Sequence, residues 1–374
     1  MIPVCEPTLS GNEIKYVTEC LKTGWISSSG NFIKQFEDKF SRYCNVEYGV
    51  SCSSGTAALH LAIEVLGIGK GDEVIIPTFT MIASCNAVIY AGAKPVLVDS
   101  ELNTWNINID KIEEKITKKT KAIMVVHTYG HPVDMDKLKK IADEYNLYLI
   151  EDAAESHGAE YKGRKTGSLG DIACFSFYAN KIITTGEGGM VVTNNEKWAE
   201  NAELLRNHFL GEPRFLHKKI GYNYRLTNIQ AAIGLAQLEK IEKYVNARRS
   251  NAKYYNNLLR SVKGIRTPPE AKWAKNVYWM YGILVQEDFG ISMPKFRDDL
   301  YKKGIDTRTF FIGMHKQPAY QGNDEMFPDI SGNYPISDEL ERKGCYLPSS
   351  SHLTKEEIAK IVDTIKTIKE GKLI

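Results

Sequence analysis

A lysine near the middle of the chain lies between two apolar segments. The stretch FSFYANKIITTGEGGMVVT, residues 175–193, contains Ser176, Lys181 and a glycine-rich turn. A lysine at the exit of a buried strand can form a Schiff base when partial burial lowers the pKa of its amine. Most lysines of a protein are solvated, so Lys181 by itself does not indicate a catalytic role. The other motifs of the chain must support such a role.

A second motif, SCSSGTAALHL at residues 51–61, joins an apolar run to a helical pattern. Free backbone N–H groups and the helix dipole make such a helix N-terminus suitable for binding a phosphate. Gly55 would let the backbone approach the anion, and Ser54, Thr56 and Ser176 could add hydroxyl groups. A plain N-cap also needs a serine or threonine here, so the motif alone leaves both interpretations open.

Two acids, Glu151 and Asp152, follow an apolar run in LIEDAAESHGA at residues 149–159. Ligands of an open α/β sheet bind at the carboxyl ends of the strands, where a buried carboxylate must be paired or hydrogen-bonded. Ala153 and Ala154 would leave room for a flat ring beside Asp152. An N-cap of a short helix is the alternative role for this aspartate.

The fourth motif, GYNYRLTNIQAAIG at residues 221–234, places Asn223 and Arg225 just before a helical pattern. These side chains suit a phosphate or a carboxylate, although turn formation and solvation explain them without a ligand. Phosphate site, aspartate and lysine together fit pyridoxal 5'-phosphate (PLP). The aspartate would keep the pyridine nitrogen protonated, and the lysine would hold the aldehyde carbon and move protons.

The elements that must position these residues alternate between apolar runs and helical patterns. Near-continuous Val, Ile and Leu runs separated by helices indicate a mostly parallel sheet covered on both faces, so the expected fold class is α/β. The predicted strands lie at 48–53, 72–80, 94–100, 121–127, 147–154, 171–178 and 188–194, and the predicted helices at 55–68, 81–92 and 135–145.

Two domains are expected, a large cofactor-binding domain at residues 1–245 and a smaller α+β domain at residues 246–374. A helical pattern at 228–262 predicts a bridge between them, and RTPPEAKW at 266–273 predicts a linker. The last helix should begin with a capping box of Thr354 and Glu357. Its expected buried stripe consists of Ile358, Ile361, Val362 and Ile365.

The composition of the 374 residues excludes several classes of partner. A net charge of +2 gives no electrostatic footprint for nucleic acid or for an anionic membrane. No segment has the apolar length of a transmembrane helix, and the N-terminus does not resemble a signal peptide. Seven scattered cysteines without a C-x-x-C pair predict free thiols in the cytoplasm and no metal site.

These motifs, in this order, resemble those of the DegT/DnrJ/EryC1/StrS family of PLP-dependent sugar aminotransferases. The resemblance covers essentially the whole chain, from IPVCEPTLSGNE to YLPSSSHLTKEEI. It implies the aspartate-aminotransferase fold (fold type I) for the large domain. It also implies that Lys181 is the Schiff-base lysine, that Asp152 pairs with the pyridine nitrogen, and that Glu155 lies near the 3-oxygen of the ring.

The resemblance also implies how the phosphate is held. Gly55, Thr56 and Ser176 would bind it within one chain, and Asn223 would reach it from the partner subunit of a homodimer. Each active site would then be shared between two chains.

The stretches GWISS, NKIITTGEGGM and YNYRLTNIQAAIGLAQLE resemble most the family members that aminate C4 of GDP-4-keto-6-deoxymannose. Such enzymes make sugars for surface polysaccharides, with L-glutamate as the implied amino donor. Trp25, Arg225 and His315 are the implied substrate contacts. A dTDP-linked ketosugar and amination at C3 remain alternatives. A sugar dehydratase, in which histidine replaces the lysine, and a non-catalytic sensor agree less well with the intact Lys181 motif.

Two positions depart from the family pattern. Met81, in TMIAS, occupies the place where these enzymes usually carry an aromatic residue that stacks on the cofactor. Its polarisable sulfur can still cover a ring face, but more loosely. Ile312 and Gly313, in FFIGMH, stand where a histidine and a proline are common.

Overall fold

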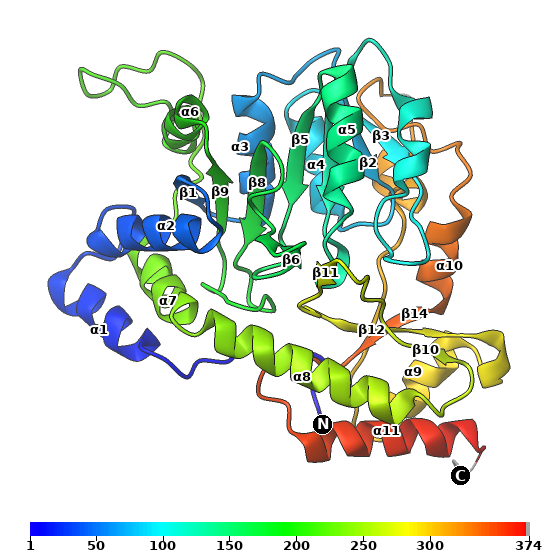
Figure 1. Ribbon diagram of the computed structural model, residues 1–374. Coiled ribbons are helices and arrows are strands. Elements are labelled where there is room, and N and C mark those ends of the chain that lie inside the picture. Colours follow the sequence, from blue (N-terminus) through cyan, green and yellow to red (C-terminus); the bar gives the residue numbers. More distant parts are fainter. Residues whose placement is uncertain (323, 372–374) are drawn as a thin grey trace.

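The computed structural model describes residues 1–322 and 324–371, and its centre is a seven-stranded sheet (Figure 1). The strand order is β1-β9-β8-β5-β4-β2-β3. The strands are β1 (Tyr48–Cys52), β2 (Glu73–Pro77), β3 (Lys94–Val98), β4 (Thr120–Val126), β5 (Tyr148–Asp152), β8 (Ile172–Ser176) and β9 (Gly189–Thr193). Only β9 runs antiparallel to its neighbours in this sheet, so the predicted α/β fold with a mostly parallel sheet is confirmed.

Helices cover both faces of this sheet (Figure 1). One face packs against α3 (Gly55–Val65), α4 (Ile82–Tyr90) and α6 (Glu196–Arg206). The other face packs against α2 (Asn31–Tyr43), α5 (Met135–Tyr145) and α7 (Asn228–Leu238). Alternation along each strand decides which layer a side chain enters. In β2, Val74 and Ile76 enter the α3–α4 layer, whereas Ile75 enters the α5 layer.

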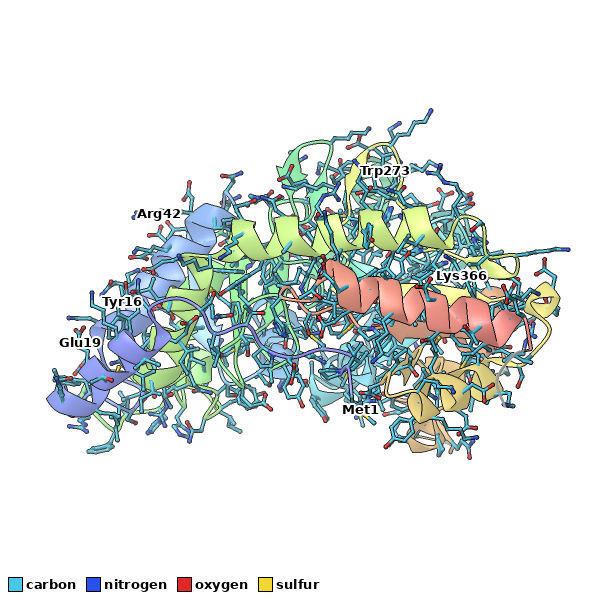
Figure 2. The ribbon with its side chains drawn as sticks, turned by 90° about the horizontal axis from the view of Figure 1, so that it is seen from below. Met1, Tyr16, Glu19, Arg42, Trp273 and Lys366 are labelled. Atoms are coloured by element: carbon cyan, nitrogen blue, oxygen red, sulfur yellow. The ribbon has the colours of Figure 1, made fainter. Side chains whose placement is uncertain are left out.

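The helical pattern at residues 228–262 forms two helices, α7 and α8 (Ile241–Leu259). A capping box of Thr227 and Gln230 starts α7, which packs against α1 (Glu13–Thr23) and α2. The helix α8 runs beside α11 (Lys355–Lys369), as the view from below shows (Figure 2). The expected boundary at residue 245 falls inside α8, and the division into two domains stays a prediction.

A second sheet, with the order β10-β12-β14-β13, organises the C-terminal part of the chain. Its strands are β10 (Ile265–Arg266), β12 (Tyr281–Val285), β13 (Arg308–Thr309) and β14 (Gly344–Leu347), and α9 (Met293–Lys302), α10 (Pro335–Lys343) and α11 accompany them. Thr354 and Glu357 form the predicted capping box at the start of α11. The predicted stripe of this helix is fully buried.

The prediction of a linker at residues 266–273 is wrong for its last residues. Trp273, which is labelled in Figure 2, packs edge-on against Tyr161, with ring centroids 5.1 Å apart. Directly after it, β11 (Ala274–Lys275) pairs with β6 (Glu160–Tyr161), which in turn pairs with β7 (Arg164–Lys165). Hydropathy along the chain does not reveal this contact, because the two aromatic residues lie more than a hundred positions apart in the sequence.

Short 3-10 helices occupy Ile109–Lys111, Glu113–Lys115, Thr128–Gly130, Glu287–Phe289, Met314–Lys316 and Pro318–Tyr320. All seven cysteines of the chain are free thiols. Among the helices of the described residues, none is long and apolar enough to cross a membrane.

Candidate active site

Polar residues meet at the carboxyl edge of the central sheet, on its α3–α4 face. Asp152 ends β5 and Ser176 ends β8. Ile150 and Cys174, two residues earlier in the same strands, belong to the core between the sheet and the helices α3 and α4. The strand period of two therefore directs Asp152 and Ser176 toward the first residues of these helices.

The start of α3 lies against Ser176. A Cβ atom added to Gly55 would lie 2.7 Å from the Cβ of Ser176, a distance that only a glycine avoids. Ser54 is the N-cap, because its hydroxyl accepts a hydrogen bond of 3.1 Å from the N–H of Ala57. The N-cap interpretation is thus correct for Ser54. It leaves Gly55 and Thr56 as the first two residues of the helix, whose N–H groups precede the intrahelical ladder.

This arrangement fits the phosphate of PLP. The two leading N–H groups of α3 and the hydroxyls of Thr56 and Ser176 are donors of the kind that bind anions at helix N-termini. Ser176 is buried, and its Oγ accepts only a weak hydrogen bond of 3.3 Å from the N–H of Tyr178. Phosphate binding by Gly55, Thr56 and Ser176 stays a prediction.

Asp152 is a buried carboxylate held by two neutral donors. Its Oδ2 accepts a hydrogen bond of 2.7 Å from Ser84 on α4, and its Oδ1 accepts one of 3.2 Å from the N–H of Ala154. Burial raises the pKa of this carboxyl above its ordinary value, although both hydrogen bonds and the charge of Lys181 act in the opposite direction. No cation among the described residues forms an ion pair with Asp152, so a protonated pyridine nitrogen would complete the site.

Glu151 has a different, structural role on the opposite face of the sheet. Its carboxylate accepts hydrogen bonds from His127 Nε2 at 2.9 Å and from the N–H groups of Gly167, Leu169 and Gly170. Burial acts to raise the pKa of Glu151, but these donors outweigh it and leave the pKa below its ordinary value. The two adjacent acids, which the sequence did not distinguish, are therefore separated by the pleat of β5.

Lys181 lies in the loop after β8, with its Nζ 3.7 Å from the ring centroid of Trp279. Burial lowers the pKa of its amine, while the negative charges of Glu155 and Asp152 raise it. No carboxylate among the described residues forms an ion pair with this lysine. A depressed pKa without a paired acid suits an amine that must be neutral to react with an aldehyde.

Glu155 is buried next to Lys181 and accepts a hydrogen bond of 2.8 Å from the N–H of Tyr129. Burial raises its pKa to about 7, against the opposing effects of Lys181 and of the Tyr129 N–H group. Tyr129 adopts a left-handed conformation with φ +53°, which is uncommon for a tyrosine. Glu155 thus lies close to the predicted site, as its expected position near the 3-oxygen of the cofactor requires.

Met81 is the N-cap of α4 and is half exposed. Its sulfur accepts a hydrogen bond of 3.1 Å from the N–H of Ala83, and Met81 lies three residues before the Ser84 that holds Asp152. The exposed side chain is available to a ring beside Asp152. Stacking of Met81 on the cofactor stays a prediction.

Asn223 and Arg225 pair with each other. The Nε and Nη2 atoms of Arg225 donate to Oδ1 of Asn223 at 3.0 and 2.7 Å, and its Nη1 donates to Asn207. The carbonyl of Tyr224, between them, accepts a hydrogen bond of 2.7 Å from the N–H of Ser53. The loop is therefore anchored beside the end of β1, while Asn223 itself is exposed and its side chain is hydrogen-bonded to Arg225 rather than to a predicted phosphate ligand of its own chain.

The remaining predicted substrate contacts lie farther out. Trp25, which follows α1, is 58% exposed, and its carbonyl accepts a hydrogen bond from Asn228. Both ring nitrogens of His315 have partners, Thr78 Oγ1 at 2.8 Å and Asp338 Oδ1 at 3.0 Å. His315 thus connects the end of β2 to α10, and contact with a sugar stays a prediction for both residues.

The two departures near His315 are also placed. Gly313 lets the His315 ring approach closely, because an added Cβ would lie 2.5 Å from its Cε1. Ile312 is half exposed. The histidine and the proline that are common at positions 312 and 313 would change the packing of the His315 ring.

Sequence reasoning missed Ser84, Tyr129 and Trp279 as neighbours of the site. For Ser84 a signal existed, because it is the last residue of the TMIAS motif and lies in the first turn of α4, at the carboxyl edge of the sheet. Trp279 gave none, since it lies about a hundred residues after Lys181, in the apolar stretch that leads into β12.

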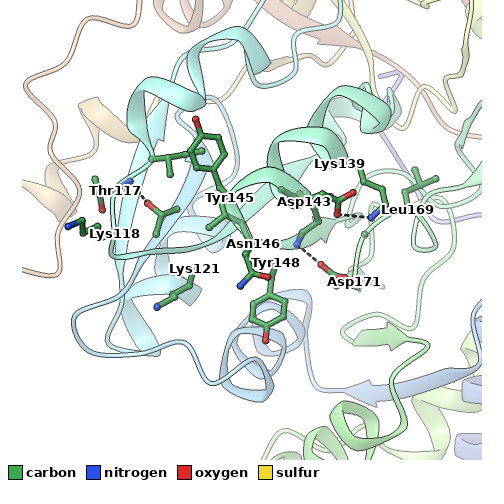
Figure 3. A pocket seen from close by; sticks show the side chains of 16 residues that line it. Thr117, Lys118, Lys121, Lys139, Asp143, Tyr145, Asn146, Tyr148, Leu169 and Asp171 are labelled. Atoms are coloured by element: carbon green, nitrogen blue, oxygen red, sulfur yellow. Dashed lines mark hydrogen bonds and ion pairs between the residues drawn. The ribbon is translucent and has the colours of Figure 1, made fainter.

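A large cavity lies elsewhere, at the amino ends of β4 and β5 beside α5 (Figure 3). Its volume is about 1050 Å³, and its lining includes Lys121, Lys139, Tyr148 and Asp171. Asp171 accepts a hydrogen bond from the N–H of Leu149, and Lys139 donates one to Asp143 (Figure 3). Parallel sheets bind ligands at the opposite edge, where Asp152 and Ser176 end their strands.

The fold is that of a PLP-dependent sugar aminotransferase of fold type I, and the residues at the carboxyl edge fit this class. Residues 7–366 match the model of the DegT/DnrJ/EryC1/StrS aminotransferase family, and the chain belongs to that family.

Individual relatives agree with this assignment over the full chain. The chain is 45% identical to a GDP-perosamine synthase of Escherichia coli O157:H7, with 97% of each chain covered. It is 44% identical to the GDP-perosamine synthase of Caulobacter vibrioides, with 98% of each covered. Among solved structures, the PLP form of a putative sugar aminotransferase from Streptococcus pneumoniae superposes with a TM-score of 0.91 at 29% identity, covering 100% of both chains.

Proposed function

We propose that this protein is a PLP-dependent aminotransferase that converts GDP-4-keto-6-deoxymannose to GDP-perosamine. L-glutamate would supply the amino group, and the product would serve in the synthesis of a surface polysaccharide such as an O-antigen. The observation that carries the proposal is the 44–45% identity to two GDP-perosamine synthases over nearly the whole chain. The Lys181–Asp152 arrangement at the carboxyl edge supports the type of chemistry.

PLP, when bound, supplies an electron sink for the carbon from which a proton is removed. Asp152 would pair with its ring nitrogen, and the hydrogen bonds from Ser84 and Ala154 keep the carboxylate in one orientation. Its buried position makes that pairing strong, because the local dielectric is low. Glu155, with its pKa of about 7, would carry a shared proton near the 3-oxygen.

Lys181 has two tasks in this proposal. Its Nζ holds the cofactor before the amino donor arrives, and afterwards it takes a proton from one carbon and returns it to another. Burial favours the neutral amine, which can take the proton, and the nearby acids Asp152 and Glu155 favour the protonated amine, which can return it.

The phosphate would be bound by the first N–H groups of α3 and the hydroxyls of Thr56 and Ser176. We infer that the partner of a homodimer adds its Asn223. The Oδ1 atom of Asn223 is occupied by Arg225, which leaves the Nδ2 group free to donate to a phosphate oxygen. The substrate would extend toward Trp25, Arg225 and His315. The proposed location of the enzyme is the cytoplasm.

A panel of nucleotide-linked ketosugars tests the proposal. The purified protein, PLP and L-glutamate are incubated with GDP-4-keto-6-deoxymannose, a dTDP-linked 4-keto sugar and a 3-keto sugar, and the amino sugars are identified by mass spectrometry and NMR. GDP-perosamine should form fastest, and Lys181→Ala should abolish its formation. A dTDP-linked or C3-aminated product formed in preference would overturn the assignment of the substrate.

The aspartate has a separate test. Asp152→Asn should lower the rate on the order of a thousandfold, because several kcal/mol of charge stabilisation at the ring are lost. A loss of only a few fold in a folded protein would show that Asp152 has no role at the pyridine nitrogen.

A further inference from the structure

Trp279 lies against Lys181, although the two residues come from distant parts of the chain. The Lys181 Nζ is 3.7 Å from the centroid of the indole ring. Trp279 is 3% exposed and precedes β12, whereas Lys181 follows β8. A cation over the face of a tryptophan is attracted by the ring quadrupole, and the attraction grows when the pair is removed from water.

A closed ring of hydrogen bonds fixes the indole in this position. Trp279 Nε1 donates to the carbonyl of Asn180 at 2.8 Å, and Cys5 Sγ donates to the same oxygen at 3.4 Å. Arg248 donates its Nη1 to the carbonyl of Trp279 at 2.7 Å and its Nη2 to Cys5 Sγ at 3.7 Å. Since Asn180 directly precedes Lys181, the ring of bonds holds the backbone of the lysine and the indole face together.

The other groups that face Lys181 are not in direct contact with its ammonium group. Asp152, at the end of β5, and Glu155, just after it, act on the amine through their charges, Cys5 acts from the N-terminal segment, and the charge of Lys181 acts in turn on His157. Burial lowers the pKa of His157 to about 3, so this histidine is neutral at ordinary pH. The indole face is thus the nearest group that favours the charged amine.

We propose that Trp279 is a positioning residue, whose indole face holds the Lys181 amino group, most strongly in its protonated form, while the lysine is not covalently bound to the cofactor. This inference rests on the proposed function of Lys181. A transaminating lysine must leave the cofactor and rejoin it in every cycle. If the amine is already held in one position, the lysine side chain loses less rotamer freedom each time it rejoins the cofactor. The reacting atoms then start from a defined geometry.

Competitive labelling of the cofactor-free protein tests this contact directly. Short pulses of acetic anhydride at several pH values, followed by peptide mass spectrometry, report how much of the Lys181 amine is neutral. Trp279→Leu keeps the site apolar but removes the π face, so the neutral amine becomes more populated. Below the titration midpoint, labelling of Lys181, normalised to its plateau at high pH, should rise roughly threefold to tenfold. Trp279→Phe should give a smaller rise.

The protein offers two matched controls. Lys165, whose Nζ lies 4.4 Å from the ring centroid of Tyr43, should keep its labelling profile in every Trp279 variant. Trp105→Leu removes another buried indole of the same core cluster and should leave the Lys181 profile unchanged. An unchanged Lys181 labelling profile in folded Trp279→Leu would overturn the proposal. If the leucine variant does not fold, an unchanged profile in Trp279→Phe would overturn it instead.

Borohydride treatment of the PLP-loaded protein separates the two proposals. Cofactor trapped on the Lys181 peptide supports the proposed function. If the labelling of Lys181 shifts in Trp279→Leu but no cofactor is trapped on Lys181, the proposed function fails. In that case the positioning role fails with it, although the contact between the two side chains stands. If cofactor is trapped on Lys181 and labelling does not shift, only the positioning role fails.

Discussion

Ser84 Oγ donates a hydrogen bond of 2.7 Å to Oδ2 of Asp152, which joins the helix α4 to the end of β5. Both residues are buried, and their positions differ by 68 in the sequence. The bond fixes one oxygen of Asp152, while the N–H of Ala154 fixes the other. The proposed partner of the pyridine nitrogen is therefore oriented before any cofactor binds.

Ser84→Ala should lower the turnover number about tenfold to a hundredfold, because a hydrogen bond to a charged group contributes roughly 1.5–3 kcal/mol. The rate of GDP-perosamine formation under saturating PLP measures this. Ser100→Ala is the matched control, since the Ser100 hydroxyl is equally buried but has no hydrogen-bond partner among the described residues. A Ser84→Ala enzyme with the wild-type rate would show that Asp152 does not need this orientation.

Gly55→Ala should weaken the retention of PLP by roughly tenfold or more. The new Cβ would lie 2.7 Å from the Cβ of Ser176, so the start of α3 and the end of β8 must move apart, and overpacking of this kind costs about 1–3 kcal/mol. Equilibrium dialysis against PLP measures the dissociation constant. In the control Gly69→Ala, the nearest atom to the new Cβ is the carbonyl oxygen of Ala91 at 3.4 Å. Equal PLP affinities of the two variants would argue against a cofactor site at Gly55.

Glu155 should make the cofactor-free protein less stable as the pH rises. Its pKa is about 7 in the folded chain and about 4.5 when unfolded, so the folded state binds the proton more tightly. The resulting stability is fully present below pH 4.5 and is lost as the pH rises through 7. Between these values, the free energy of unfolding of the wild type should fall by about 3 kcal/mol relative to Glu155→Gln.

Urea denaturation at pH 5 and pH 8, with and without the substitution, measures this difference. Glu114→Gln, which changes an exposed glutamate, should keep the pH dependence of the wild type. If Glu155→Gln also keeps it, the carboxyl group of Glu155 is not protonated in the folded chain near neutral pH.

Mixed dimers should reveal whether the active sites are shared. Lys181→Ala and Asn223→Ala are each expected to be nearly inactive, and chains mixed at random in a two-fold dimer give about half heterodimers. If Asn223 serves the partner's site, each heterodimer has one site with both lesions and one with neither. About a quarter of the wild-type activity should then return. Inactive heterodimers would instead place Asn223 in the site of its own chain.

Much of the fold follows from short-range patterns. The apolar runs predicted all seven strands of the central sheet, and α5 lies at the predicted residues Met135–Tyr145. The capping box of Thr354 and Glu357 also formed as predicted. These features depend on the period of the side chains and on local hydrogen bonds, which the chain carries within a few residues of each position.

For the candidate site, the sequence predicted only the residues at the ends of strands and at the start of a helix. Asp152 and Ser176 end neighbouring parallel strands at one edge of the sheet, and Gly55 lies against Ser176, while their roles in binding a cofactor stay predictions. A position at the end of a strand does not say which of two adjacent acids faces the site. The partners of Glu151 decide that: they are His127, directly after β4, and the backbone of residues 167–170, between β7 and β8.

The sequence by itself determined the fold class, the order of the strands along the chain and the residue types at the carboxyl edge. Only the tertiary structure decided that Ser84 holds Asp152, that the indole of Trp279 covers Lys181, and that Trp273 docks on Tyr161. Secondary structure reflects local periodicity, whereas these contacts join residues 68 to 112 positions apart. These contacts form because the packing of sheet and helix layers brings distant residues together. Local sequence patterns do not predict that packing.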